Sequence, residues 1–352
     1  MLPRIKKEYL DGRLMLFLGA GASAGSLDYS GNPIPLGNTL AKELAEEIGW
    51  NYNNEPLSVV YSAFESQNSA KLYQYLQYRL TNTKPSKAYL SITRYPWSRI
   101  YTTNIDDCLE RAIKSKSSQR LNSFNFASNL EEIDTLFQTV QLIKLNGCTN
   151  NPKDGFIFSP QEYGEKSSRL PPWYRELAQN SGSYTFLYIG SRLNEPILQH
   201  IFAMMREELS RSPLQGYVIT PNATEIEKHH LNSLNLTHIS GTVADFANWM
   251  KLEIPKVPSD WDLATARRPE YKHLKVKFTL SQKRAINNVT VVSPDALPRN
   301  LDATDSGSIR NFYKGFKPTW RDIVDDVPAR ISQIEQFVEK IRTESKIGKC
   351  FA

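Results

Sequence analysis

Three short segments stand out as candidate binding or catalytic sites. The first is a glycine loop after the apolar run 14–18, with the residues Gly19, Ala20, Gly21, Ala22 and Ser23. Its two glycines let the backbone turn tightly and approach a diphosphate, while a following helix offers unpaired amides to negative charge. Ser23 can add a hydroxyl donor. The loop therefore predicts a diphosphate site, although a tight turn with close helix packing also explains it, because the full G-x-G-x-x-G spacing is absent.

The other two segments each follow a strand candidate further along the chain. Asn104 and Asp106 lie between an apolar stretch and a helical one, where side chains of these types often cap a helix instead of binding a ligand. Asn146 and Gly147 form an Asn-Gly pair, which is a common turn signal. Amide and carboxylate groups at these positions could hold a polar ligand or a water molecule.

The elements around these segments predict an α/β protein with a doubly wound parallel sheet. Short apolar runs alternate with helical or loop stretches, as they do when strands and helices take turns. The strand candidates are residues 14–18, 99–103, 140–145, 185–189 and 217–220. Ligands in such sheets bind beyond the carboxyl ends of the strands. All three segments fall at that edge, so they are expected to form one site.

Two helical regions precede the second strand candidate. Asn38 is expected to cap a helix over residues 39–48 that ends at Gly49. Helical pattern then continues over residues 56–94 until Tyr95 and Pro96 interrupt it. We expect a small helical insert at about residues 36–95.

The chain changes character after residue 252, where prolines punctuate a polar stretch. A strand-like run at 274–280 is followed by a helical pattern at 320–341 with one apolar stripe. We therefore expect a first domain at 1–252 and a mixed or helical C-terminal extension at 253–352. That extension could lead to further domains in a longer protein.

The composition predicts a soluble globular protein. It is 40% hydrophobic and 23% charged over 352 residues, and no apolar run approaches the roughly 20 residues of a membrane span. We expect a cytoplasmic location, because three widely spaced cysteines fit a reducing compartment. The net charge of +6 permits a nucleic-acid partner. Its Lys and Arg residues are scattered, however, which favours a solvated basic surface.

Taken together, five ordered segments of residues 1 to about 250 resemble the sirtuin-like domain of bacterial antiphage defence proteins, which destroy NAD during infection. The resemblance implies a Rossmann-like fold. It rests on the glycine loop, the segment 102–106, the segment 144–147 and two later pairs, Gly190 with Ser191 and Gly241 with Thr242.

The resemblance also implies roles for these residues. The glycine loop, including Ala22, would bind the cofactor, chiefly through its diphosphate. Thr103, at the end of the second strand candidate, would also contact the cofactor. Asn104 would position the attacking water at the nicotinamide ribose, and Asp106 would contact the nicotinamide carboxamide. The later pairs would contact the ADP side, with Thr242 near the adenine.

Hydrolysis is the reaction expected from this family likeness. Deacylases of the family hold a structural zinc with two cysteine pairs, and the isolated Cys108, Cys148 and Cys350 cannot supply four ligands. We therefore expect no zinc, and water instead of acyl-lysine as the acceptor. The products would be ADP-ribose and nicotinamide.

Asn146 is where this chain departs from the family pattern, which has a catalytic histidine there. An amide has no titratable proton near neutrality, so the expected loss is on the order of 10²- to 10⁴-fold in rate. Either the asparagine is an engineered inactivation that traps NAD, or the site naturally binds NAD without turnover. The first is favoured, since Asn104 and Asp106 remain as an active site needs them.

Partners follow from the same likeness. Residues 314–320 resemble a connector that precedes an NTPase module in larger defence proteins, and no G-x-x-x-x-G-K-[ST] loop occurs in this chain. We expect a homo-oligomer activated by a sensor or NTPase module, or by a partner, in response to a phage-derived trigger. The alternative is a non-catalytic module that senses NAD or an ADP-ribose derivative.

Overall fold

The computed structural model describes residues 2–129, 137–158, 171–193 and 215–269, together with positions 162, 164, 198, 199, 201 and 202. The predictions for 274–280, 314–320 and 320–341 lie outside this part of the chain. No helix within the described ranges is long and apolar enough to cross a membrane.

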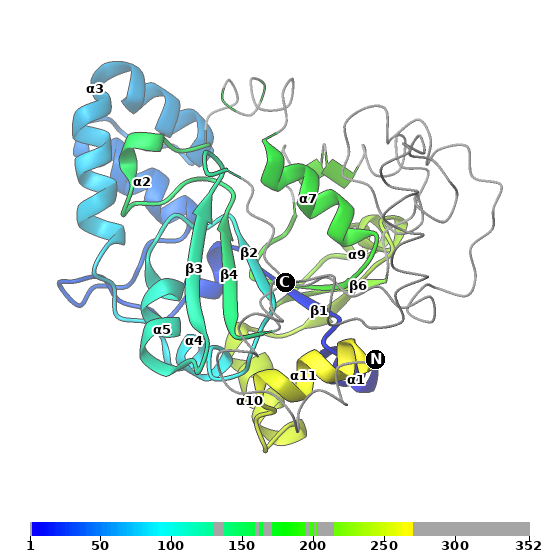
Figure 1. Cartoon of the computed structure of the whole chain (residues 1–352). Helices are drawn as coiled ribbons and strands as arrows, with labels where there is room; N and C mark the ends of the chain where they lie inside the picture. Colours follow the sequence, from blue (N-terminus) through cyan, green and yellow to red (C-terminus); the bar gives the residue numbers. More distant parts are fainter. Residues whose placement is uncertain are drawn as a thin grey trace, which may run out of the picture. The chain divides into compact units, whose positions relative to one another are not determined.

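Within the described residues, seven parallel strands form one sheet in the order β3-β4-β2-β1-β5-β6-β7 (Figure 1). The predicted α/β class and doubly wound sheet are confirmed, and so are all five strand candidates. These are β1 (Leu14–Leu18), β2 (Arg99–Thr102), β4 (Thr139–Lys144), β5 (Thr185–Ile189) and β6 (Gly216–Thr220). The chain runs outward from β1 on one side and returns to add β5 on the other.

Two strands escaped the sequence analysis, and both are edge strands. β3 (Arg120–Asn125) and β7 (Leu236–Ser240) close the two ends of the sheet. Edge strands are half-solvated, so β3 reads RLNSFN and β7 reads LTHIS, without the continuous apolar run of a central strand. Their polar composition concealed them.

Alternate residues of the central strands enter two different packed layers. Leu16 pairs with Leu187 and both belong to the main hydrophobic core, which includes residues of α1 to α5 and α10. Phe17 pairs with Tyr188 on the opposite face, with ring centroids 5.2 Å apart. Helix α7 (Pro172–Ser181) contacts this second face, and Figure 1 shows it across the sheet from α5.

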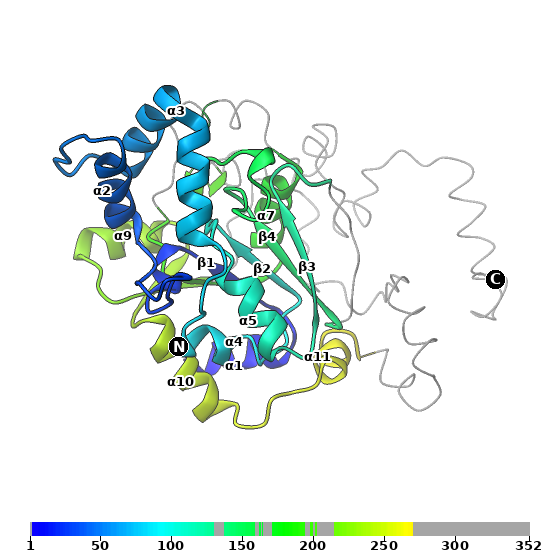
Figure 2. The ribbon, with the colours of Figure 1, turned by 90° about the vertical axis from the view of Figure 1, so that its left-hand side faces the viewer.

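Helices before β2 form the predicted insert. They are α2 (Gly37–Glu47), α3 (Leu57–Leu80) and α4 (Lys87–Ile92). Helix α3 packs beside α2 (Figure 2) and departs from helical geometry at Asn68. The predicted cap at Asn38 is wrong, because the helix begins two residues earlier than predicted, at Gly37, and Leu36 occupies the cap position. Gly49 follows the helix with a φ of 76°, as a helix end requires.

The remaining helical elements complete the layers on the sheet. They are α1 (Leu2–Leu10), the short 3₁₀ turns η1 (Ala20–Ser23) and η2 (Pro152–Asp154), α5 (Cys108–Lys116), α9 (Glu225–Ser233), α10 (Val243–Glu253) and α11 (Asp260–Arg267). Leu263 and Ala264 of α11 join the main core. The boundary placed at residue 252 stays a prediction.

Candidate active site at the carboxyl edge of the sheet

The glycine loop after β1 packs directly against the loop after β5. Gly19 donates from its amide to Ile189 O at 2.9 Å, and Gly21 donates to Gly190 O at 2.8 Å. A Cβ on Gly190 would lie 2.2 Å from Ala22 N, and Gly190 has a φ of +70°. These glycines are therefore required by close backbone approach. Close packing thus explains the glycines, but the loop packs against the loop after β5 and not against a helix. A role in binding a diphosphate stays a prediction.

A buried polar cluster joins this loop to the segment after β2. Asn104 Nδ2 donates to Gly19 O at 3.1 Å and to Ser23 Oγ at 2.9 Å. Ser23 Oγ donates to Asp106 Oδ2 at 2.9 Å. Tyr89 OH lies 3.2 Å from Ser23 Oγ and 3.4 Å from Asn104 Nδ2. Three residues singled out from the sequence thus meet, and a fourth joins them.

The chemistry of the partners fixes the direction of these hydrogen bonds. Gly19 O can only accept, so the nitrogen of the Asn104 amide faces it and the oxygen faces away. A carboxylate at Asp106 also only accepts, so Ser23 gives its proton there and receives hydrogen bonds from Asn104 and Tyr89. Within the described residues, no group donates to Asn104 Oδ1. That oxygen is the acceptor available to a ligand or water.

Tyr89 is the functional candidate that the sequence analysis missed. It lies on α4, in the helical insert, and is 1% exposed. Burial raises its pKa well above the usual value, and the charge of Asp106 adds to this, so its hydroxyl stays protonated and can donate. A tyrosine at a core position of a helix gives no local signal of such a role. The only hint is general: a buried tyrosine hydroxyl needs a partner.

Asp106 contacts both the start of α5 and the polar cluster, while its role toward a ligand stays a prediction. Its Oδ1 accepts from Cys108 N at 3.0 Å at the start of α5, while its Oδ2 holds Ser23. The adjacent Asp107 instead anchors the loop between α3 and α4 by accepting from Thr83 N at 3.0 Å and Thr83 Oγ1 at 2.6 Å. Both aspartates therefore stabilise the loop, and Asp106 alone touches the cluster.

Asn146 follows β4, which is the strand next to β2. Because Thr102 is paired with Lys144, Asn104 and Asn146 each lie two residues beyond the same pairing. Asn146 is 2% exposed. Tyr174 OH donates to Leu145 O at 2.6 Å and lies 3.4 Å from Asn146 Oδ1. Gly147 has a φ of +102°, so the predicted Asn-Gly turn is present. Asn146 is therefore a buried turn residue, and it follows the strand next to the one that precedes Asn104.

The other predicted ligand positions spread along the same edge. Thr103 is buried beside Asn104, and Ser191 Oγ accepts from Leu193 N at 3.0 Å. Thr242 caps α10 through a reciprocal pair of hydrogen bonds with Asp245. It follows edge strand β7, three strand spacings or about 14 Å from β1. The edge therefore offers positions from Asn146 on one side to Thr242 on the other.

Metal chemistry finds no obvious donor set here. Among the described residues, no group of three His, Cys, Asp or Glu side chains is placed to hold a metal ion. Cys350 lies outside them, while Cys108 and Cys148 are buried free cysteines.

The fold and this edge define a Rossmann-like α/β protein with a polar site at the carboxyl ends of its central strands. Residues 98–239 match the family model described as a SIR2-like domain. This match supports the sirtuin-like domain that the motifs predicted.

Two curated relatives and one solved structure are similar to the chain. "NAD(+) hydrolase ThsA" of Acinetobacter baumannii (strain 532279) is 25% identical over 227 residues, which is 62% of this chain and 44% of the relative. "NAD(+) hydrolase ThsA" of Bacillus cereus (strain MSX-D12) is 20% identical over 220 residues, or 60% of this chain and 44% of the relative. The chain thus spans less than half the length of either.

A crystal structure of a Sir2 homolog–NAD complex matches 71% of this chain and 93% of its own, at 14% identity and a TM-score of 0.39. This similarity is too low to support an inference about function.

Proposed function

We propose that the site belongs to an NAD hydrolase, which converts NAD to ADP-ribose and nicotinamide, and that Asn146 impairs it in this chain. One observation carries the proposal: Ser23, Asn104 and Asp106 form one buried cluster that leaves Asn104 Oδ1 open. Both curated relatives are named NAD(+) hydrolases, which supports the same reaction.

The cluster suits cleavage of the nicotinamide N-glycosidic bond. This cleavage builds positive charge on the ribose, which nearby carbonyl and carboxylate oxygens stabilise. Asn104 Oδ1 would accept a hydrogen bond from the attacking water or a ribose hydroxyl. Asp106 would supply negative charge beside it and contact the nicotinamide carboxamide if Ser23 releases its Oδ2. Gly19 to Ser23 would face the diphosphate, and the loops after β5 and β7 the adenosine.

Asn146 would occupy the place of the general base. An imidazole there could take a proton from the water or a ribose hydroxyl near neutral pH, which a carboxamide cannot do. The proposal includes an engineered origin for this asparagine. It also includes a cytoplasmic effector of antiviral defence, active as a homo-oligomer and controlled by a sensor, an NTPase module or a phage-derived trigger.

The decisive experiment compares NAD consumption by the chain and by Asn146→His over a range of protein concentrations that would expose activation by assembly. We expect a gain on the order of 10²- to 10⁴-fold in the histidine variant. Asn150→His, on an exposed position of the same loop, is the matched control and should gain nothing. Asn104→Ala in the Asn146→His background should abolish the gain.

The alternative is a module that binds NAD or an ADP-ribose derivative without turnover. It is favoured by the burial of Asn146 and by the hydrogen bond that Ile157 N donates to Asn146 O at 3.1 Å, which fit a turn residue with a structural role. Calorimetric NAD binding without hydrolysis by either protein would support it. Failure of both proteins to bind NAD would refute the hydrolase, and failure to bind ADP-ribose as well would refute both functions.

A further inference from the structure

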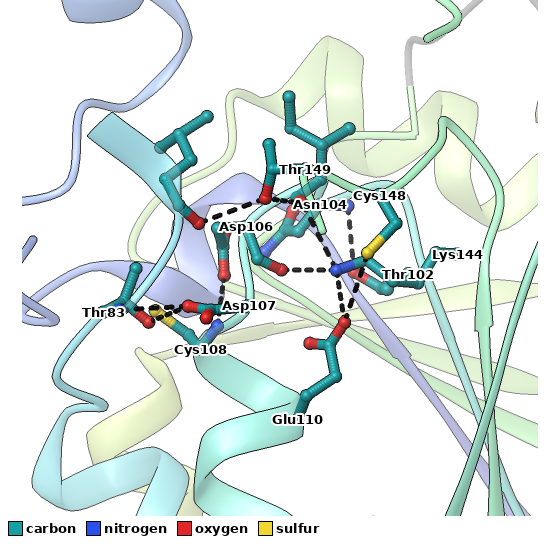
Figure 3. Close-up of polar contacts among 12 residues, drawn as sticks. Thr83, Thr102, Asn104, Asp106, Asp107, Cys108, Glu110, Lys144, Cys148 and Thr149 are labelled. Carbon is teal, nitrogen blue, oxygen red and sulfur yellow. Dashed lines mark hydrogen bonds and ion pairs between the residues drawn. The ribbon is translucent and has the colours of Figure 1, made fainter. Parts of the chain in front are cut away.

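Lys144 is a buried cation at the end of β4, directly beneath the loop that carries Asn104 and Asp106. Its side chain is 1% exposed. The ammonium nitrogen donates to Glu110 Oε1 at 2.7 Å, to Ile105 O at 3.3 Å and to Asp106 O (Figure 3). An ammonium has three protons, so these three acceptors use all of them.

A charge in this position is costly for stability. Removing two charges from water costs several kcal/mol per ion, and well-packed apolar residues in their place are often neutral or stabilising. Moreover, Glu110 Oε2 is buried without a hydrogen-bond partner among the described residues. Stability alone therefore does not explain the ion pair. Its contacts with the carbonyls of Ile105 and Asp106 suggest another role.

We infer that the Lys144–Glu110 pair positions the active-site loop by holding the main-chain carbonyls of Ile105 and Asp106. The inference rests on the proposed function to the extent that this loop is catalytic. Lys144 and Glu110 touch no reacting atom in this scheme. They act through the backbone on each side of Ile105, from which the side chains of Asn104 and Asp106 extend into the cluster.

The other anchors of this loop leave that task to Lys144. Thr149 holds Ile105 O through its amide at 3.0 Å and its hydroxyl at 2.9 Å. Asp107 N donates to Leu80 O at 3.1 Å. Between these two anchors lies the carbonyl of Asp106, and Lys144 is the side chain that reaches it. Burial lowers the pKa of Lys144, but the combined effects of Glu110, Cys148 and Asp106 raise it overall, so the donor stays charged.

The test replaces both charges with apolar residues of similar size, as Lys144→Met with Glu110→Leu. The matched control is Arg99→Met with Glu176→Leu, because Arg99 on β2 and Glu176 on α7 form a second, largely buried ion pair on the opposite face of the same sheet. Three properties are measured in full-length protein: the urea midpoint, hydrogen exchange of a peptide containing amides 104–108, and NAD binding by calorimetry. Turnover is compared in the Asn146→His background.

We expect both double variants to keep a urea midpoint close to that of the parent. The Lys144 and Glu110 double variant alone should exchange amides 104–108 faster and lose NAD turnover by about 10- to 100-fold, the loss expected for charge-assisted hydrogen bonds. Unchanged exchange in that peptide would overturn the inference. So would faster exchange with unaltered NAD binding and turnover, or an equal loss of turnover in the control.

A second variant guards against misfolding of the first. Lys144→Gln with Glu110→Gln keeps an amide donor for Asp106 O, so its turnover loss should be smaller, below about tenfold. A loss equal to that of the apolar pair would contradict the positioning role. Hydrogen exchange needs no NAD, so this readout decides the loop inference even if the parent binds no NAD and the proposed function fails.

Discussion

The carboxyl and amino edges of the sheet use similar devices for different ends. Each has a buried ion pair, a buried tyrosine hydroxyl and a crowded glycine with positive φ. At the carboxyl edge these are Lys144 with Glu110, Tyr89 and Gly190; at the amino edge they are Arg99 with Glu176, Tyr9 and Gly12. The amino-edge groups hold the scaffold together, whereas the carboxyl-edge groups contact the loops of the candidate site.

The ion pairs show this difference most clearly. Arg99 is paired with Gln141 in the sheet, and its guanidinium donates to the Gln141 side chain at 2.8 Å and to Glu176. Lys144 is paired with Thr102, three positions further along, so it projects to the opposite face and reaches α5. Arg99 donates to side chains, whereas Lys144 makes two of its three hydrogen bonds to the backbone of a loop. The same kind of pair can thus lock a layer or place a loop.

The largest expected effect comes from removing one charge of either pair. Lys144→Met and Arg99→Met each leave a buried glutamate without its cation, which costs about 3–5 kcal/mol. Urea unfolding of both variants should therefore give similar losses. A much smaller loss for Lys144→Met would mean that Glu110 is solvated when alone, and would weaken the parallel between the two edges.

Alanine at the two crowded glycines should have the next largest effect. Gly190→Ala and Gly12→Ala both force alanine into a left-handed conformation, at about 1–2 kcal/mol, and add overlap with backbone atoms 2.2 and 2.9 Å away. Gly31→Ala is the control, because its φ is +92° but nothing lies within 4 Å. Thermal unfolding should place both variants below the control, and calorimetry should find weaker NAD binding for Gly190→Ala alone. Equal NAD binding by Gly190→Ala and Gly12→Ala would remove Gly190 from the site.

The central part of the fold could be predicted because buried parallel strands leave a strong signal. Continuous apolar runs such as Leu14–Leu18 revealed five strands, whereas β3 and β7 were missed because edge positions tolerate polar residues. The cap at Asn38 failed for a different reason. Helix α2 begins at Gly37 without a side-chain cap, so local preference did not determine its start.

The site was predictable only where its residues fall in short motifs. Ser23, Asn104 and Asp106 follow strand ends, so the sheet brings them together. Tyr89 and Glu110 lie on helices and reach the loops through tertiary packing that leaves no local pattern. Such contacts depend on how α4 and α5 sit on the sheet, which one sequence does not reveal.

The two tyrosines provide a finer test of the edges. Tyr89→Phe removes a hydroxyl from Ser23, and Tyr9→Phe removes one that donates to Pro96 O at 3.2 Å. Each loss should cost about 0.5–1.5 kcal/mol of stability. In the Asn146→His background, Tyr89→Phe should also lower turnover by about 2- to 10-fold, whereas Tyr9→Phe should not. If both variants change turnover equally, Tyr89 has no special role in orienting Ser23.

The smallest expected effect is a difference in how the two ion pairs respond to pH. Burial raises the pKa of Glu176, and Arg99 offsets this only in part, so the native state binds this proton more tightly than the unfolded chain. The free energy of unfolding should therefore fall as pH rises from about 4.3 through the native pKa, by about 1.4 kcal/mol for each unit between the two values. Glu176→Gln lacks this carboxyl, so its stability relative to the parent should improve between pH 4 and 7 in urea titrations.

Lys144 should affect the pH dependence of stability at the opposite, alkaline end of the scale. Its raised pKa means that its contribution to stability is complete below about pH 10.4, the unfolded value, and is lost as pH rises through the native one. Lys144→Met with Glu110→Leu should then differ from the parent in its pH dependence above pH 10. If the difference in free energy of unfolding between the parent and Glu176→Gln does not change between pH 4 and 7, burial does not raise the pKa of Glu176. The two edges would then differ only in the loops they hold.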